Sequence, residues 1–110
     1  MTTTAKALLE SKYAENSQTT QYTASGVRAI IDKFSAYNGT GGSVTLAINL
    51  VASGGSAGAS NLKVSKSLTA GETYGFPEIV GHVLNSGDFI STIAGAATSI
   101  VIRISGREVT

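Results

Sequence analysis

Residues 26–52, GVRAIIDKFSAYNGTGGSVTLAINLVA, decide the fold of this chain, because apolar and polar side chains alternate on both sides of a glycine-rich turn. In residues 43–52 one face carries Val44, Leu46, Ile48 and Leu50, and the opposite face carries small or polar residues. This two-residue period is typical of a β-strand with one buried face.

The alternation in residues 27–37 is imperfect, since Ile31 and Phe34 are out of phase. A β-bulge near Asp32 and Lys33 would reset the period and turn both apolar side chains inward. The turn NGTGG that follows is rich in residues that accept a positive φ. We therefore expect the two strands to form a hairpin.

Further short strands are expected outside this stretch, at residues 62–68, 73–76, 83–84, 89–94 and 99–105. Turn signals recur about every ten residues, which is typical of an all-β, two-sheet antiparallel sandwich or jelly roll of about seven or eight strands. We expect residues 26–110 to form this β-sandwich domain. The segment SGGSAGASN, residues 53–61, is expected to be a flexible loop, and residues 106–110 a short tail.

Residues 1–25 lack a core-facing period and are expected to be an extended N-terminal arm outside the sandwich. Thr4 is positioned to cap a short helix over residues 5–10, and the rest of the arm is expected to be extended. Leu8, Leu9, Tyr13 and Tyr22 are apolar or aromatic side chains on this arm. They are the candidate partner-contact residues, since tyrosine offers a large contact area at a low entropic cost.

Composition excludes several classes of function. The 110 residues suffice for one domain, and eight Lys and Arg against seven Asp and Glu leave a net charge of +1, without the basic surface of a nucleic-acid binder. The absence of Cys excludes disulfide scaffolds, Cys-ligated zinc and thiol catalysis. No apolar run reaches a membrane-spanning length, and no secretory signal is recognised, so we expect a chain made in the cytoplasm that contacts no membrane.

No catalytic, cofactor or metal motif emerges from the remaining residues. The glycine-rich segments lack the Lys-Ser or Lys-Thr of a phosphate loop. His82 is the one histidine, and Glu72, Glu78 and Asp88 are the carboxylates that a small sandwich enzyme would have to bring together with it. We expect a protein that is not an enzyme and has no cofactor and no metal.

Three stretches resemble small structural proteins of tailed bacteriophage virions. They are GVRAIIDKFSAYNGTGGSVTLAINLV (residues 26–51), SLTAGETYGFPEIVGHVLNSGDFIST (67–92) and IVIRISGREV (100–109). Within them, a Leu-x-x-Gly-Asp-x-Ile turn and strand is followed by a small-residue break and a final Arg-x-Ser-Gly-x-Glu strand. The resemblance covers residues 26–110 and not the N-terminal arm.

The resemblance implies a non-enzymatic virion protein, most simply a capsid decoration or cement protein that binds the outside of a phage head and stabilises capsomer contacts. Its partners would be the major capsid protein or other virion proteins and further copies of itself, for which we favour a trimer. It would be assembled into the virion in the bacterial cytoplasm. Two alternatives stay open: a neck, tail or fibre component, and a receptor- or carbohydrate-binding module.

Overall fold

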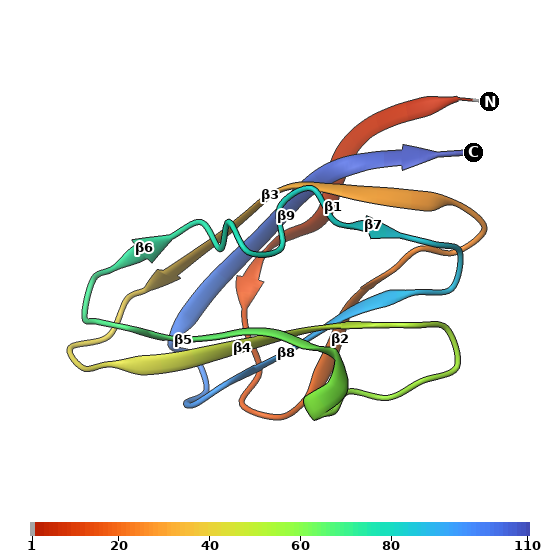
Figure 1. Ribbon diagram of the computed structural model, residues 1–110. Helices are drawn as coiled ribbons and strands as arrows, with labels where there is room; N and C mark the ends of the chain where they lie inside the picture. Colours follow the sequence, from red (N-terminus) through yellow and green to blue (C-terminus); the bar gives the residue numbers. More distant parts are fainter. Residues whose placement is uncertain (1) are drawn as a thin grey trace.

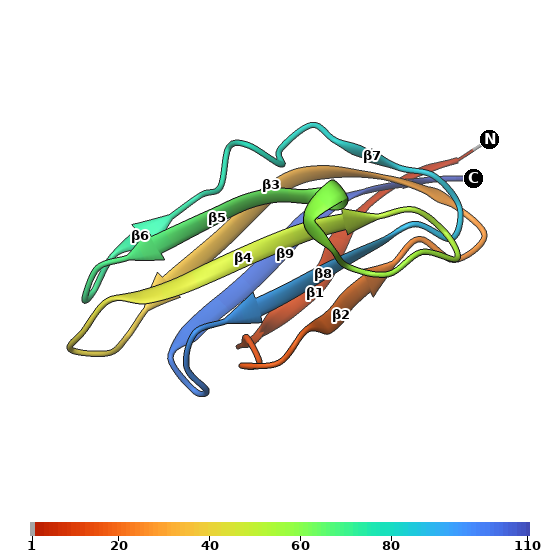
Figure 2. The ribbon, with the colours of Figure 1, turned by 60° about the horizontal axis from the view of Figure 1, so that its bottom comes forward.

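The computed structural model describes residues 2–110 and contains two antiparallel β-sheets packed face to face (Figure 1). Sheet A has the order β1 (Thr3–Tyr13), β9 (Ile100–Val109), β3 (Arg28–Asn38) and β6 (Thr73–Tyr74), and β7 (Val83–Leu84) pairs with the other end of β3. Sheet B has the order β2 (Thr19–Thr23), β8 (Phe89–Ala94), β4 (Val44–Val51) and β5 (Leu62–Leu68), and Figure 2 shows its four strands side by side. The predicted all-β sandwich is confirmed, with nine strands in the described residues rather than seven or eight.

The connectivity is that of a jelly roll. The first strand pairs with the last and successive strands pair inward along the chain, which gives the antiparallel pairs β1–β9, β2–β8, β3–β6 and β4–β5. The further pairs β3–β9 and β4–β8 connect these strands into two sheets. Two sheets built in this way bury one face each against the other.

The core lies between the sheets and is built mainly from isoleucine, leucine and phenylalanine. β9 contributes Ile100, Ile102 and Ile104, which are all fully buried, as the alternation in residues 99–105 predicts. Phe34 and Phe76 meet edge to face with ring centroids 5.3 Å apart. Other fully buried apolar residues come from both sheets and from the loop after β6: Ile31, Leu46, Ile48, Leu68, Ile79 and Ile90.

Gly106 lies where β1, β9 and β3 approach most closely. The predicted bulge in β3 is confirmed: the register against β9 shifts between Ile31 and Lys33, and Ile31 and Phe34 are both fully buried. β1 has a matching register shift at Leu8, whose side chain is buried beside Gly106. A Cβ on Gly106 would overlap the carbonyl oxygen of Ile30 and lie 2.8 Å from Leu8 Cδ1, so only glycine fits.

The predicted hairpin between residues 27–37 and 43–52 is wrong. β3 belongs to sheet A and β4 to sheet B, so the turn between them is a corner at which the chain crosses the core. The buried amide of Asn38 holds this corner: it donates to the carbonyl oxygens of Gly42 (2.8 Å) and Leu68 (2.9 Å) and accepts from the Thr40 backbone N–H (3.0 Å). Alternation predicts that each strand has a buried face. It does not say whether the two strands are neighbours in one sheet or face each other across the core from different sheets.

The predicted extended N-terminal arm and its short helix at residues 5–10 are also wrong. β1 and β2 are strands of the two sheets, paired with β9 and β8. An isolated six-residue helix is marginal, whereas β9 offers a complete row of backbone partners. Residues 106–109, expected as a tail, continue β9 and pair with β1, so the two ends of the chain lie side by side (Figure 1).

The remaining elements follow the predictions more closely. β5, β7 and β8 lie at the expected positions, and β6 is shorter than expected. The expected flexible loop at residues 53–61 contains the 3₁₀-helix η1 (Ala59–Asn61), and Asn49 of β4 donates to Asn61 Oδ1 (2.7 Å) and the Gly58 carbonyl oxygen (3.0 Å). Within residues 2–110 no helix has the length and apolar character needed to cross a membrane.

We predict that Gly106→Ala lowers the free energy of unfolding by about 2 kcal/mol, because the added methyl forces β9 away from β3 and Leu8. Chemical denaturation measures this change. Gly58→Ala is the matched control: its backbone is extended (φ −164°) and an added Cβ meets nothing within 4 Å. If the two variants had the same free energy of unfolding, the strands around Gly106 could separate without loss of stability, and the prediction would be wrong.

Candidate docking face

The four predicted contact residues of the N-terminal segment lie in different environments. Leu8 is 7% exposed and belongs to the core, and Leu9 is partly buried and packs against the core. Tyr22, on β2, also packs against the core. Tyr13 is 52% exposed at the end of β1, so it alone of the four presents a large apolar surface to a partner.

Tyr22 links sheet B to sheet A through a short hydrogen bond from its hydroxyl to the carboxylate of Glu108 on β9. Lys6 Nζ lies 3.3 Å from the same carboxylate. The Tyr22 hydroxyl and, to a lesser extent, Lys6 hold the pKa of Glu108 below its ordinary value of 4.5, although burial opposes this. Burial, together with the neighbouring carboxylate, raises the pKa of Tyr22. The contacts of Glu108 with Tyr22 and Lys6 therefore connect the ends of β1 and β9 to sheet B.

Tyr13 is part of a row of side chains across the outer surface of sheet A. Val101 of β9 pairs with Tyr13 on one side and with Tyr37 of β3 on the other. Directly paired residues share a face, and the inward positions of β9 are taken by Ile100 and Ile102, so the three side chains point outward. Tyr37 is 46% exposed. Tyr13, Val101 and Tyr37 are called the tyrosine row below.

A second apolar area lies at the other end of the same surface. Ile30 of β3 pairs with Val83 of β7, and Val83 is 53% exposed. Among residues 2–110, three of the five large apolar side chains that are most exposed therefore lie on the outer surface of sheet A: Tyr13, Tyr37 and Val83. Tyrosine and arginine are enriched at protein interfaces, and gathered apolar surface of this kind marks contact sites.

Charged side chains lie between and beside the two apolar areas. Arg107 forms a bidentate pair with Asp32, with both N···O distances 2.9 Å, and Arg103 Nε lies 3.8 Å from Glu10 Oε1. The Arg107 guanidinium holds the pKa of Asp32 below its ordinary value. Two more cations, Arg28 and Lys33, lie on β3. Arg28 pairs with Val109 and Lys33 with Ser105, which are outward positions of β9, so both cations also point outward.

Arg28 and Lys33 form no salt bridge with any residue in the described part of the chain. The surface thus carries four cationic and two anionic side chains, a net charge of +2. We call this surface the docking face: the outer side of β1, β9, β3 and β7, with the tyrosine row at one end and Ile30 and Val83 toward the other. Lys33 and Arg103 lie between these apolar areas, and Arg107 and Arg28 lie beside Ile30.

The edge strands β1, β5 and β2 have features that disfavour pairing with a strand of another chain. The outer edge of β1 is interrupted by two register shifts, between Ala7 and Leu9 and between Leu9 and Lys12. The edge strand β5 carries Lys63 and Lys66, and the edge strand β2 has five residues with a register shift of its own. Bulges, lysines and short lengths are the features that keep edge strands from pairing with other chains.

The groups that a small enzyme would need do not come together. Glu72 accepts from the Thr69 backbone N–H (2.8 Å), Glu78 from the Tyr74 hydroxyl (2.8 Å), and Asp88 from the backbone N–H groups of Ser53 and Asn85. Among residues 2–110 no hydrogen bond joins two of these carboxylates or links one to His82. The same residues contain no group of three or more potential metal ligands.

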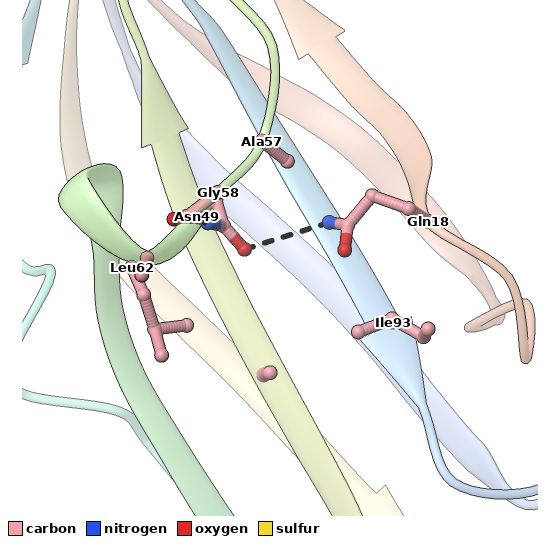
Figure 3. A pocket seen from close by; sticks show the side chains of 8 residues that line it. Gln18, Asn49, Ala57, Gly58, Leu62 and Ile93 are labelled. Carbon is pink, nitrogen blue, oxygen red and sulfur yellow. Dashed lines mark hydrogen bonds between the residues drawn. The ribbon is translucent and has the colours of Figure 1, made fainter.

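A shallow hollow of about 210 Å³ lies on the outer side of sheet B (Figure 3). Its lining includes the apolar side chains of Ala47, Ile93 and Leu62 and the amide side chains of Gln18 and Asn49. These amides are engaged within the protein: Gln18 Nε2 donates to Ser91 Oγ (2.8 Å), and Asn49 Nδ2 donates to the loop at Gly58 and Asn61. The hollow has no stacking aromatic side chain of the kind that sugar-binding sites use.

Sequence reasoning selected Tyr13 but missed most of the docking face. Val101, Arg103 and Arg107 alternate with the buried isoleucines of β9, which is the signal that places them outward. Tyr37, near the end of β3, was not among the candidate contact residues and is half exposed. The pairing of Tyr13 with Val101 required the position of β1, which the sequence did not predict.

No protein-family model matches the chain, and no curated protein does. The chain is similar to a solved structure of a Bacillus endospore appendage, described as one of a novel family of disulfide-linked pili. The two are 15% identical, the alignment covers 99% of this chain and 88% of that chain, and the TM-score is 0.53. At this level of identity the similarity concerns the fold alone.

We predict that Tyr22→Phe lowers the free energy of unfolding at pH 7 by about 1 kcal/mol, since it removes one hydrogen bond to a charged group and keeps the ring. The pKa of Glu108 is lowered in the folded state, so this stabilisation is present above its ordinary value of 4.5 and is lost as the pH falls through the folded-state value. Denaturation curves between about pH 3 and pH 8 measure the difference from the wild type.

The matched control is Tyr74→Phe, which removes the hydroxyl that donates to the exposed carboxylate of Glu78. We expect a smaller effect, because water replaces a surface hydrogen bond readily. A difference between Tyr22→Phe and the wild type that stays constant down to pH 3 would mean that Glu108 is not the partner that matters.

Proposed function

We propose that this chain is a non-enzymatic structural protein that binds other subunits of a large particle through the docking face. The tyrosine row carries the proposal: two half-exposed tyrosines flank a valine on three hydrogen-bonded strands. Side chains held on a sheet lose little freedom on binding, so their apolar area contributes efficiently to affinity. The separated carboxylates and His82 fit such a protein better than they fit a catalyst.

The particle that we propose is a tailed-phage virion, with the chain as a decoration or cement protein on the outside of the head. The support is the resemblance of residues 26–110 to small virion proteins, together with a net charge of +1 that suits an outer surface better than contact with packaged DNA. A head under internal pressure is stabilised by any domain that buries area across the seams between capsomers. A trimer would suit threefold positions of such a shell.

A second candidate is a subunit of a polymeric surface appendage, which the similarity to the endospore appendage structure favours. That protein belongs to disulfide-linked pili, whereas this chain has no cysteine. An appendage of this chain would therefore have to be held by contacts other than disulfides. The two proposals differ in the partner: other proteins of a shell in the first, and copies of this chain in the second.

The test mixes the purified chain with phage head shells assembled without it and counts bound copies by quantitative gel or mass spectrometry. We expect saturable binding in hundreds of copies per shell. A count of about six or twelve would instead place the chain at the neck or tail, whose rings have low symmetry numbers. Binding to no shell, with filaments of the chain alone in electron micrographs, would support the appendage. A monomer that does neither would contradict both proposals.

We predict that the double variant Tyr13→Ser, Tyr37→Ser weakens shell binding at least about tenfold, because it removes the apolar anchors of the docking face. The control Leu62→Ser removes an apolar side chain that is 44% exposed on sheet B, and its binding should be unchanged. Thermal unfolding of each variant checks that the fold is kept. Deleting residues 1–22 would not test the face, because it removes β1 and most of β2 from the sheets.

A further inference from the structure

We infer that the partner of the docking face presents carboxylates to Arg28 and Lys33, so that it is a different protein with an acidic patch and not the same face of a second copy. The inference rests on the proposed function and specifies the chemistry of the partner. It follows from where these two cations stand relative to the apolar ends of the face.

Along β3, Lys33 lies between the two apolar areas, and Arg28 lies beside the second area, two residues beyond Ile30. Tyr37 is at one end of this strand and Ile30 is near the other, paired with the exposed Val83 of β7. At about 3.3 Å per residue the span from Tyr37 to Arg28 is about 30 Å. A partner that covers both apolar areas therefore also covers Lys33, and Arg28 stands directly beside the covered area.

The β3 bulge leaves Lys33 without a counter-charge on this chain. The extra residue turns Asp32 and Lys33 outward together, and both oxygens of Asp32 are already taken by Arg107. Arg28, opposite Val109 near the end of β9, likewise has no anionic partner among the described residues. A cation that loses its water on docking is costly unless the partner supplies acceptor oxygens, and a carboxylate is the most favourable acceptor because it also supplies the opposite charge.

The charge of the face also argues against a second copy as the occupant. Two docking faces laid on each other would bring a surface of net charge +2 against another of +2, and like charges across an interface oppose association. The acidic residues that this chain could offer lie elsewhere: Glu72 is within 3.7 Å of its own Lys66, and Glu78 binds Tyr74. An acidic surface on another protein meets the requirement without these conflicts.

The first experiment measures binding of the chain to head shells that lack it, at low and at high salt. We expect Arg28→Glu, Lys33→Glu to weaken binding about tenfold or more and to flatten its salt dependence, because the two attractive contacts become repulsive. The control Lys63→Glu makes the same kind of charge change on β5 of sheet B, where we expect no effect. Wild-type binding that does not respond to salt or to the double variant would overturn the inference and leave the proposed function standing.

The second experiment decides the inference even where the shells do not bind. A carbodiimide, which joins an amine directly to a carboxylate, is applied to the cells or particles in which the chain is naturally present, and cross-linked peptides are identified by mass spectrometry. We expect Lys33 to be joined to an aspartate or glutamate of another protein, and the cross-link to disappear in Lys33→Gln. Three results would each overturn the inference: no cross-link at Lys33, a cross-link from Lys33 to a second copy of this chain, or Lys63 reacting in its place.

Discussion

The close approach of β1, β9 and β3 around Gly106 is the constraint on which the rest of the structure depends. Because Gly106 has no Cβ, the carbonyl group of Ile30 and the side chain of Leu8 both come within contact distance of it. Both strands that flank β9 have a bulge near this glycine, β3 at Asp32 and β1 at Leu8. Each bulge resets the side-chain period, and as a result Ile31, Phe34 and Leu8 all enter the core.

The same bulges decide what the outer surface of sheet A displays. In β3 the extra residue brings Asp32 and Lys33 out together; Asp32 then pairs with Arg107 and Lys33 is left free. Beyond the bulge the outward positions lead to Tyr37, which lies beside Val101 and, across it, Tyr13. Core packing and surface chemistry are thus consequences of one local irregularity, and a straight β3 would exchange buried and exposed side chains along half its length.

The sequence was sufficient to predict the strands with strong alternation, the bulge at Asp32 and the sandwich class, because each depends on the local period of apolar residues. It was insufficient wherever pairing partners mattered. The alternation in residues 27–37 and 43–52 indicates buried faces but not that the strands belong to different sheets. Residues 3–13 show little alternation because β1 is an edge strand with two register shifts, so its pairing with β9, and with it the tyrosine row, had no local signal.

The size of the docking face bears on how such a chain would work. A surface about 30 Å long and three to four strands wide, with strands about 4.8 Å apart, lies at the small end of specific interfaces. A single copy would therefore bury little area, and without cysteine it forms no disulfide to a partner. Lasting attachment then requires several contacts at once, either by copies that associate with each other or by a partner repeated on a regular lattice. A jelly roll with one apolar and charged outer face, and with edge strands interrupted by register shifts, is suited to such repeated contacts.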